Sequence, residues 1–317
     1  MIKKKRTATA LAGLAFILIA AVGWAVAGCQ ARPKGEIGVM ITRAPTSRST
    51  ITPANSGAPD RAGSPTPAPP ALVPTDQPDP GEAFVPAGYH LVFSDEFNGA
   101  TLNTKKWNTL APWGVQWYSD SGQKQAFVPS AVSVGNGIVR FTAQPANGDP
   151  NANGQPYTSG SITTNRAFTH GYYEARVKVP EGQGLWPALW LTSSTRWPPE
   201  WDIFEIISGT DYGFPHPLSG GKCSWVKGAA GSDNTYKVPD QYGVYHIYGF
   251  LWTATDITWY VDGVLTEHYA INAAAGAGDA YWWNVSLQVG GNWPGDPDST
   301  TPFPAYMDVD YMRLYQK

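Results

Sequence analysis

The stretch PPEWDIFEIISG, residues 198 to 209, combines the composition of a buried strand with three acidic side chains. Between the acids, its residues are aromatic or β-branched, which are the types most frequent in strands. Side chains of a regular strand alternate between two faces, so Glu200 and Asp202 share a face that Glu205 does not. A β-bulge at Ile203 or Phe204 inserts one extra residue and returns Glu205 to that face. We therefore predict a bulged strand with one buried apolar face and one acidic face.

Similar short segments recur from Tyr89 to Lys317, separated by Gly, Pro, Asn and Asp. Helical periodicity is nearly absent, so this pattern predicts an all-β sandwich. We place the domain at residues 88–317, with strict alternation in its last strand broken near Met312. The clearest predicted strands are 137–144, 171–179, 185–193, 200–207, 244–252, 256–263, 284–291 and 307–316.

The first 28 residues have the pattern of an export signal. A basic segment from Lys3 to Arg6 precedes an apolar run that ends at Gly28. The sequence VAGC at 26–29 resembles a bacterial lipobox, which implies cleavage before Cys29 and acylation of its thiol. An uncleaved membrane helix is the alternative, because about 20 apolar residues can span a bilayer. Both interpretations predict an exported, membrane-anchored protein at the bacterial cell surface, with secretion as a further alternative.

Residues 29–87 are rich in Pro, Ser, Thr and Ala and predict a disordered tether. The formal net charge is −3, and removing residues 1–28 makes it more negative because they hold four basic and no acidic side chains. This balance argues against a nucleic-acid partner. With only Cys29 and Cys223, the chain has no multi-bridge disulfide framework, and we expect a monomer.

The acidic face suggests chemistry on sugars. Neighbouring carboxylates raise one another's proton affinity, so at least one of the three is expected to be protonated near neutral pH. A protonated carboxylic acid can donate to a glycosidic oxygen while an ionised one attacks the anomeric carbon, and retaining glycosidases hold these two groups about 5 to 5.5 Å apart. A calcium cluster or a solvated sheet edge is the alternative, because carboxylates also bind calcium.

Residues 200–205, Glu-Trp-Asp-Ile-Phe-Glu, resemble the bulged Glu-x-Asp-x-x-Glu signature of glycoside hydrolase family 16. Further segments resemble this family and follow in its order: FSDEFNGATLNTKKWN (93–108), GYYEARVKVPEGQGLWPALWLT (171–192), ITWYVDG (257–263), VGGNWPGDPD (289–298) and MDVDYMRLY (307–315). The resemblance covers nearly all of residues 90–317. It departs from the family at Trp201, where a smaller aliphatic residue is usual, and in SDSGQKQAF (119–127), which lacks an Asn-Glu pair often found there.

The resemblance implies a concanavalin-like jelly-roll β-sandwich with a concave substrate cleft and no cofactor for catalysis. It also implies Glu200 as nucleophile, Glu205 as acid/base, and Asp202 as the residue that orients and tunes Glu200. The bulged form is the one typical of laminarinases and galactan hydrolases.

Aromatic rings suit the C–H faces of pyranose sugars, and amides suit their hydroxyls. By resemblance, we expect the following residues around the sugar subsites: Trp186, Trp190, Trp197, Trp293, Asn292 and Gln288. Core burial of the tryptophans and a surface or loop position of the two amides are the alternatives. We expect Trp107, Trp252 and Trp259 in the sandwich core.

The family resemblance also implies one structural calcium on the convex side. The matching ligands are Glu96, the backbone of Gly137, and Asp310, and this set of carboxylate and carbonyl oxygens suits that cation.

The leading hypothesis is an endo-acting retaining β-glucan hydrolase, a β-glucanase or laminarinase that cleaves β-1,3 linkages in a polysaccharide substrate. The alternatives within the family are a β-1,3-1,4-glucanase, a galactanase and a transglycosylase. A non-catalytic, lectin-like glycan-binding module is a third hypothesis. The acidic strand separates it from the others, because a binding module has no need for two glutamates and an aspartate aligned by a bulge.

Overall fold

The computed structural model describes residues 79, 81–111, 114, 116, 121–197, 199–207, 210–216, 218–219, 222–223, 235–236, 238–271 and 278–317, with backbone alone for the four ranges between 210 and 236. The predicted signal segment 1–28, Cys29, most of the predicted tether and the Cys223 side chain lie outside this description. Within the described residues, no helix combines the length and apolar character that a bilayer-spanning segment needs.

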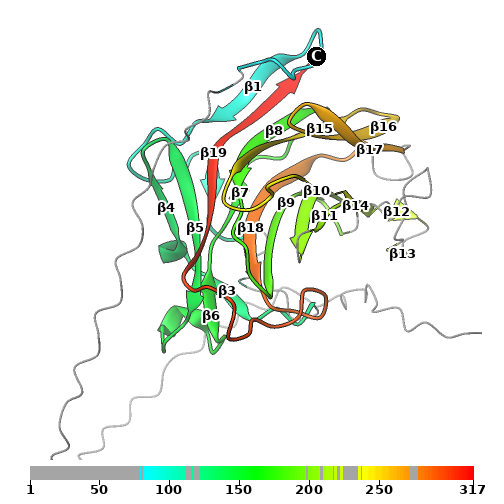
Figure 1. The fold of residues 1–317 in the computed structure, drawn as a ribbon. Helices are drawn as coiled ribbons and strands as arrows, with labels where there is room; N and C mark the ends of the chain where they lie inside the picture. Colours follow the sequence, from blue (N-terminus) through cyan, green and yellow to red (C-terminus); the bar gives the residue numbers. More distant parts are fainter. Residues whose placement is uncertain are drawn as a thin grey trace, which may run out of the picture. The chain divides into compact units, whose positions relative to one another are not determined.

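One layer of the sandwich is a ten-stranded sheet (Figure 1). Its strands are β1 (His90–Asp95), β3 (Gln125–Phe127), β4 (Val132–Gly135), β5 (Ile138–Pro145), β6 (Tyr157–Ser159), β8 (Gly171–Lys178), β15 (Tyr245–Trp252), β16 (Asp256–Val261), β17 (Val264–Ala270) and β19 (Ala305–Gln316). They are ordered β17-β16-β15-β8-β19-β5-β6-β3, with β1 beside β19 and β4 beside β5. Two short 3-10 helices, η2 (Pro129–Ala131) and η3 (Pro150–Ala152), lie in the connections.

The other layer is a seven-stranded sheet in which every strand pair is antiparallel. Its strands are β2 (Trp107–Asn108), β7 (Ser161–Thr164), β9 (Leu185–Ser193), β10 (Glu200–Ile207), β11 (Thr210–His216), β14 (Thr235–Tyr236) and β18 (Tyr281–Val289). The order is β14-β11-β10-β9-β18-β7-β2, and β12 (Leu218–Ser219) pairs separately with β13 (Lys222–Cys223). Figure 1 shows β9, β10 and β18 side by side at the centre of this layer. The predicted strands 185–193 and 200–207 coincide with β9 and β10.

The core between the two sheets is rich in aromatic rings. Phe204 on β10 contacts Tyr248 on β15 with ring centroids 4.4 Å apart. Trp107, Trp252 and Trp259, predicted in the core, are at most 1% exposed, which confirms that prediction. Each large apolar side chain that is fully buried contributes about 1.5 to 3 kcal/mol. This aromatic core therefore stabilises the sheet that carries the acidic strand.

The last strand, β19, contains a bulge. Its register against β8 shifts between Val309 and Tyr311. Val309 and Met312 lie in the core, whereas the Tyr311 hydroxyl donates to Glu174 at 3.1 Å. The break in alternation therefore lies just before Met312, because Asp310 and Tyr311 both face away from the core.

Residues that precede position 88, the predicted start of the domain, already contact the domain. The Asp79 carboxylate accepts a hydrogen bond from Arg313 Nη1 at 3.0 Å, and Phe84 lies against Gly263 in the β16–β17 turn. Gly263 has a φ of +76°, and a Cβ there would clash with the Phe84 ring. The end of the predicted tether is thus held on the domain by an ion pair and a ring contact.

Candidate active site

The acidic strand β10 has the bulge that the sequence predicts. Its register against β9 shifts between Asp202 and Phe204, and its register against β11 shifts between Asp202 and Glu205. Ile203 and Phe204 both belong to the core. Because two successive side chains face inward, Glu205 returns to the face that carries Glu200 and Asp202.

A hydrogen bond from the opposite sheet holds this bulge. The indole Nε1 of Trp259 on β16 donates to the backbone carbonyl of Asp202 at 2.8 Å. A buried carbonyl without a donor costs about 1 to 3 kcal/mol, so this contact stabilises the irregular backbone. The sequence predicted Trp259 as a core residue without this role. No local pattern connects two residues 57 positions apart.

Neighbouring strands bring predicted sugar-binding residues to the acidic face. On β9, Trp190 lies opposite Asp202, and on β18, Gln288 lies opposite Trp186. Directly opposed residues of antiparallel strands share a face, so both tryptophans and Gln288 line the surface that bears the acids. Trp186 and Trp190 are 7% and 8% exposed. They form the floor of the site.

Each glutamate accepts a hydrogen bond from an indole. Trp186 Nε1 donates to Glu205 Oε1 at 2.9 Å, and Trp197 Nε1 donates to Glu200 Oε2 at 3.1 Å. Trp186 lies within β9, while Trp197 lies in the loop between β9 and β10 and is 40% exposed. The two ends of the acidic row thus have the same type of donor in different surroundings.

Asp202, between the glutamates, is 3% exposed. This burial raises its pKa well above the usual aspartate value, because a charged carboxylate is poorly solvated there. This direction favours a neutral Asp202. Removal from water is its main cause, whereas the sequence predicts repulsion between carboxylates.

Gln288 is held by a ladder of amides. It accepts a hydrogen bond from Gln123 Nε2, and Gln123 Oε1 accepts one from Gln125 Nε2 at 2.5 Å. The backbone N–H of Val289 then donates to Gln125 Oε1 at 2.8 Å. Sequence reasoning missed Gln123 and Gln125, although they lie in the segment 119–127 that departs from the family pattern. That departure was the available signal.

The loop after β18 carries the remaining two predicted subsite residues. Asn292 is exposed, and Trp293 is 39% exposed. The Trp293 ring stands edge-on to Trp186, with centroids 5.6 Å apart and planes at 89°. At this end of the site, the exposed Trp293 ring forms a side wall and the buried Trp186 ring forms the floor.

The sequence profile of Glycosyl hydrolases family 16 matches residues 115–313. The chain belongs to glycosyl hydrolase family 16. It is 33% identical over 70% of its length to the endo-1,3-1,4-β-glycanase ExsH of Rhizobium meliloti (strain 1021), and it spans 51% of that relative, about half.

Two solved structures of family 16 proteins are similar to this chain. One is the laminarinase catalytic domain of Thermotoga maritima, with a TM-score of 0.60, 30% identity, and coverage of 72% of this chain and 98% of that one. The other is a mutant of SCLam, a non-specific endo-β-1,3(4)-glucanase, with a 1,3-β-D-cellobiosyl-glucose at its active site. Its TM-score is 0.62, its identity 28%, and its coverage 74% of this chain and 96% of that one. The jelly-roll sandwich is therefore the family 16 fold, as predicted.

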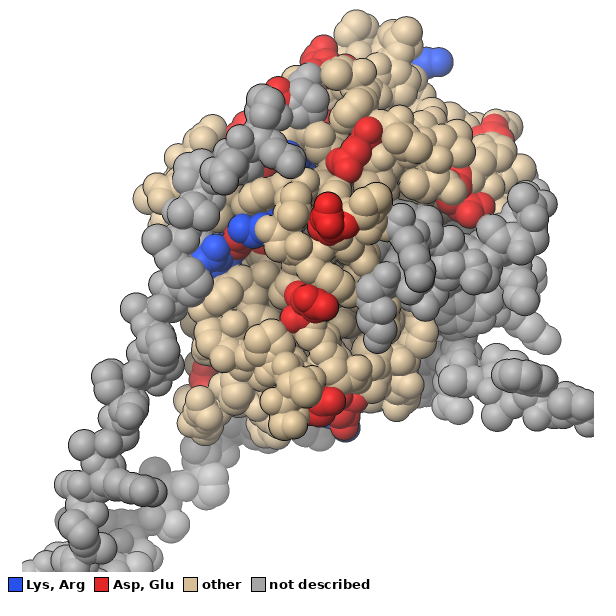
Figure 2. Space-filling model, in the orientation of Figure 1, with Lys and Arg blue, Asp and Glu red and all other residues tan. Residues whose placement is uncertain are grey.

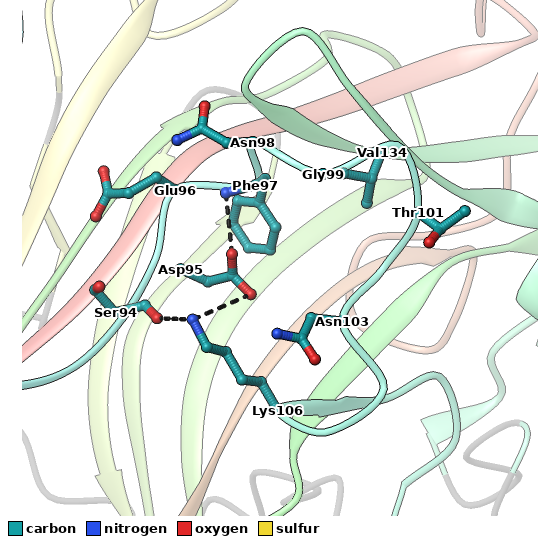
Figure 3. A pocket seen from close by; sticks show the side chains of 10 residues that line it. All are labelled: Ser94, Asp95, Glu96, Phe97, Asn98, Gly99, Thr101, Asn103, Lys106 and Val134. Carbon is teal, nitrogen blue, oxygen red and sulfur yellow. Dashed lines mark hydrogen bonds and ion pairs between the residues drawn. The ribbon is translucent and has the colours of Figure 1, made fainter.

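The residues predicted to bind calcium lie away from the acidic face. Glu96, Gly137 and Asp310 line one cavity of about 330 Å³ together with Asp79. An adjacent cavity of about 300 Å³ is drawn in Figure 3, where Asp95 points toward Lys106 and Glu96 points away from it. Within the described part of the chain, no group of three or more His, Cys, Asp or Glu side chains is placed to hold a metal ion.

Proposed function

We propose that this chain is a retaining endo-β-glucanase whose preferred substrate is a β-1,3-glucan. The observation that carries the proposal is the bulge in β10, which gathers Glu200, Asp202 and Glu205 on one face. Trp186 and Trp190 border these acids on β9. Family membership and the similarity to the laminarinase domain support the glycosidase chemistry.

In the proposed mechanism, Glu200 attacks the anomeric carbon while Glu205 protonates the leaving oxygen. The bond to the leaving sugar breaks and a covalent glycosyl–Glu200 ester forms. Glu205, now ionised, then removes a proton from water, which attacks the anomeric carbon and releases Glu200. The raised pKa of Asp202 favours its neutral form, and this form repels an ionised Glu200 less than a carboxylate would.

A neutral glucan suits the surroundings of the site. The residues that border the acids are indoles and amides, which stack on sugar rings and bind hydroxyls. On the face drawn in Figure 2, most of the described surface belongs to uncharged residues, and described Lys and Arg side chains are few. A mixed-linkage β-1,3-1,4-glucan is the second candidate, because the relative ExsH is named an endo-1,3-1,4-β-glycanase.

The test is release of reducing ends from laminarin, lichenan, agarose and carrageenan by the full-length protein. Glu200→Gln is the matched variant because it keeps the side-chain shape. We expect release from laminarin or lichenan by the wild type alone, with retained anomeric configuration in ¹H NMR of the first products. Inverted products would contradict the mechanism. Binding of glycans with no cleavage of any polymer would favour the lectin-like alternative.

We also propose a structural calcium at the cavity formed by Glu96, Gly137 and Asp310. Two carboxylates and a carbonyl are donors that calcium prefers, and this chemistry supports the proposal. The Glu96 carboxylate also accepts hydrogen bonds from Arg313 at 2.7 and 3.0 Å, so a bound cation would share it with a guanidinium. The expected result is a melting temperature that falls in chelator and recovers with added calcium. Equal melting in both would contradict the site.

Export and anchoring through residues 1–29 form a third proposal, supported by the basic segment, the apolar run and VAGC at 26–29. Labelling of cells with a tagged fatty acid should mark the protein, and Cys29→Ser should abolish the label. An unlabelled wild-type protein that stays in the membrane fraction would favour the uncleaved helix instead.

A further inference from the structure

The loop that joins β9 to β10 is tied at both ends. The backbone N–H of Ser193 donates to the carbonyl of Pro199 at 3.1 Å and closes the loop. The next residue, Ser194, donates to the Ala280 carbonyl at 2.8 Å. These two contacts hold the residues at both ends of the loop.

An ion pair fixes the loop from the side. Asp279 accepts two hydrogen bonds from Arg196 Nη2, at 3.0 and 3.2 Å, and one from Ser193 Oγ at 3.1 Å. Arg196 directly precedes Trp197, whose indole donates to Glu200. A chain of contacts thus runs from Asp279 through Arg196 and Trp197 to the proposed nucleophile.

We infer that Trp197 is a positioning residue for Glu200, held in place by the pair of Arg196 and Asp279. This inference rests on the proposed function. The indole N–H binds Oε2 of Glu200 at 3.1 Å and so restricts the orientation of the carboxylate. The exposed ring remains available to a sugar, so one side chain combines substrate contact with orientation of the nucleophile.

The N–H also favours the ionised form of Glu200, because a hydrogen bond to a carboxylate stabilises its charge. Loss of the donor therefore raises the proton affinity of Glu200, and the acidic limb of the kcat/KM profile moves to higher pH. The other ionisable groups near Glu200 are on several elements. Among the described side chains they are Asp202 and Glu205 on β10, Tyr281 on β18, and Arg196 and Asp279 in the loops. The backbone of His216 on β11 is the register partner of Glu200.

The decisive experiment separates the N–H from the ring. Replacing Trp197 by β-(3-benzothienyl)alanine, which has sulfur in place of N–H, keeps the bicyclic shape, and Trp197→Phe is the genetically simple version. We expect kcat/KM on the wild type's best glucan to fall about tenfold, mainly through kcat, which matches the loss of one hydrogen bond to a charged group. The acidic limb should rise by about half to one pH unit.

Trp293→Phe is the matched control because Trp293 is exposed to nearly the same extent, 39% against 40%. It should raise KM and leave the acidic limb in place. If the benzothienyl protein behaves like Trp293→Phe, Trp197 is a sugar platform only and the inference fails. His216→Gln in the Trp197→Phe background should preserve the shift of the limb, and loss of the shift there would assign it to His216.

Variants of the Arg196–Asp279 ion pair should have a smaller effect on kcat/KM and on the acidic limb, in the same direction. Asp279→Asn and Arg196→Gln should each lower kcat/KM about two- to threefold and move the acidic limb upward, as expected for a partly exposed ion pair. Arg196→Lys should restore most of the loss. An unchanged pH profile in both variants would exclude this pair from the positioning of Trp197.

A readout without substrate keeps this inference distinct from the proposed function. In ¹H–¹⁵N NMR, the Trp197 indole resonance should shift as Glu200 ionises, and Glu200→Gln should abolish that inflection. A wild-type protein that shows the inflection but cleaves no glycan would overturn the proposed function and leave the contact standing. Activity without the inflection would overturn the inference alone.

Discussion

Two bulged strands of this protein, β10 and β19, carry acids in the same arrangement. Each has two acidic residues separated by one apolar residue, Glu200 and Asp202 on β10 and Asp308 and Asp310 on β19. The register shift comes after Asp202 on β10 and spans Asp310 on β19. One strand lies in the seven-stranded sheet and the other in the ten-stranded sheet. The difference between them lies in the groups that surround their carboxylates.

On β19, the acids are paired with cations. Asp308 accepts hydrogen bonds from Arg140 at 2.6 and 2.8 Å and pairs with Lys178 at 3.0 Å, and Asp310 pairs with Arg176 at 2.9 Å. The glutamates of β10 accept from the neutral indoles of Trp186 and Trp197. A cation beside a carboxylate offsets its charge, whereas an indole N–H binds the carboxylate without supplying a countercharge. The first arrangement serves stability, and the second suits proton transfer.

The largest expected difference is in catalysis. Glu200→Gln should lower kcat by about 10⁴-fold or more, the scale found when a nucleophile is removed from an enzyme. Its free energy of unfolding should change little, because Gln keeps the side-chain shape and its amide oxygen can still accept the Trp197 N–H. Initial rates on laminarin and urea unfolding measure the two effects. A kcat within tenfold of the wild type would remove Glu200 from the mechanism.

The matching change on β19 should act on stability. Asp308→Asn leaves Arg140 and Lys178 beside an uncharged amide in a site where Asp308 is fully buried. We expect the free energy of unfolding to fall by about 3 to 5 kcal/mol, with kcat of the folded protein nearly unchanged. Denaturant unfolding and active-site titration give these values. Unchanged stability would mean that the two strands do not differ as described.

A third change tests how the β10 bulge is held. Trp259→Phe removes the N–H that the Asp202 carbonyl accepts and should destabilise the protein by about 1 to 3 kcal/mol. Because the bulge sets the direction of Glu205, kcat should fall as well. Trp252→Phe is the control, since its Nε1 has no hydrogen-bond partner among the described residues. Equal losses of kcat in both variants would show that ring volume, and not the hydrogen bond, matters.

The smallest effect concerns pH. The folded state raises the pKa of Asp202, so above about pH 4 it binds a proton that the unfolded chain has lost. Stability from this group is therefore complete at lower pH and declines as pH rises toward the folded pKa, by at most about 1.4 kcal/mol per pH unit. Asp202→Asn should gain stability relative to the wild type as pH increases from 5 to 8. Parallel pH profiles in denaturant unfolding would contradict a neutral Asp202.

Much of the candidate site was predictable because local physics constrains it. Glu205 would face the core in a regular strand, so charge alone required an irregularity in β10, and the register shift is there. In β19 the same parity argument predicted a break near Met312, and the observed shift is one or two residues earlier. The odd or even spacing of side chains along a strand shows that a bulge is present but does not locate it to one residue. Either of two adjacent residues can be the inserted one.

The amino-acid order by itself determined the strands, the apolar face of the core and the row of acids, since alternation and burial depend on neighbours along the chain. Only the tertiary structure decided which groups touch that row: Trp259 holds the bulge from the opposite sheet, and the Gln123 ladder reaches Gln288 across 165 positions. Hydrogen bonds act over about 3 Å, so such partners become neighbours only after the sheets have packed.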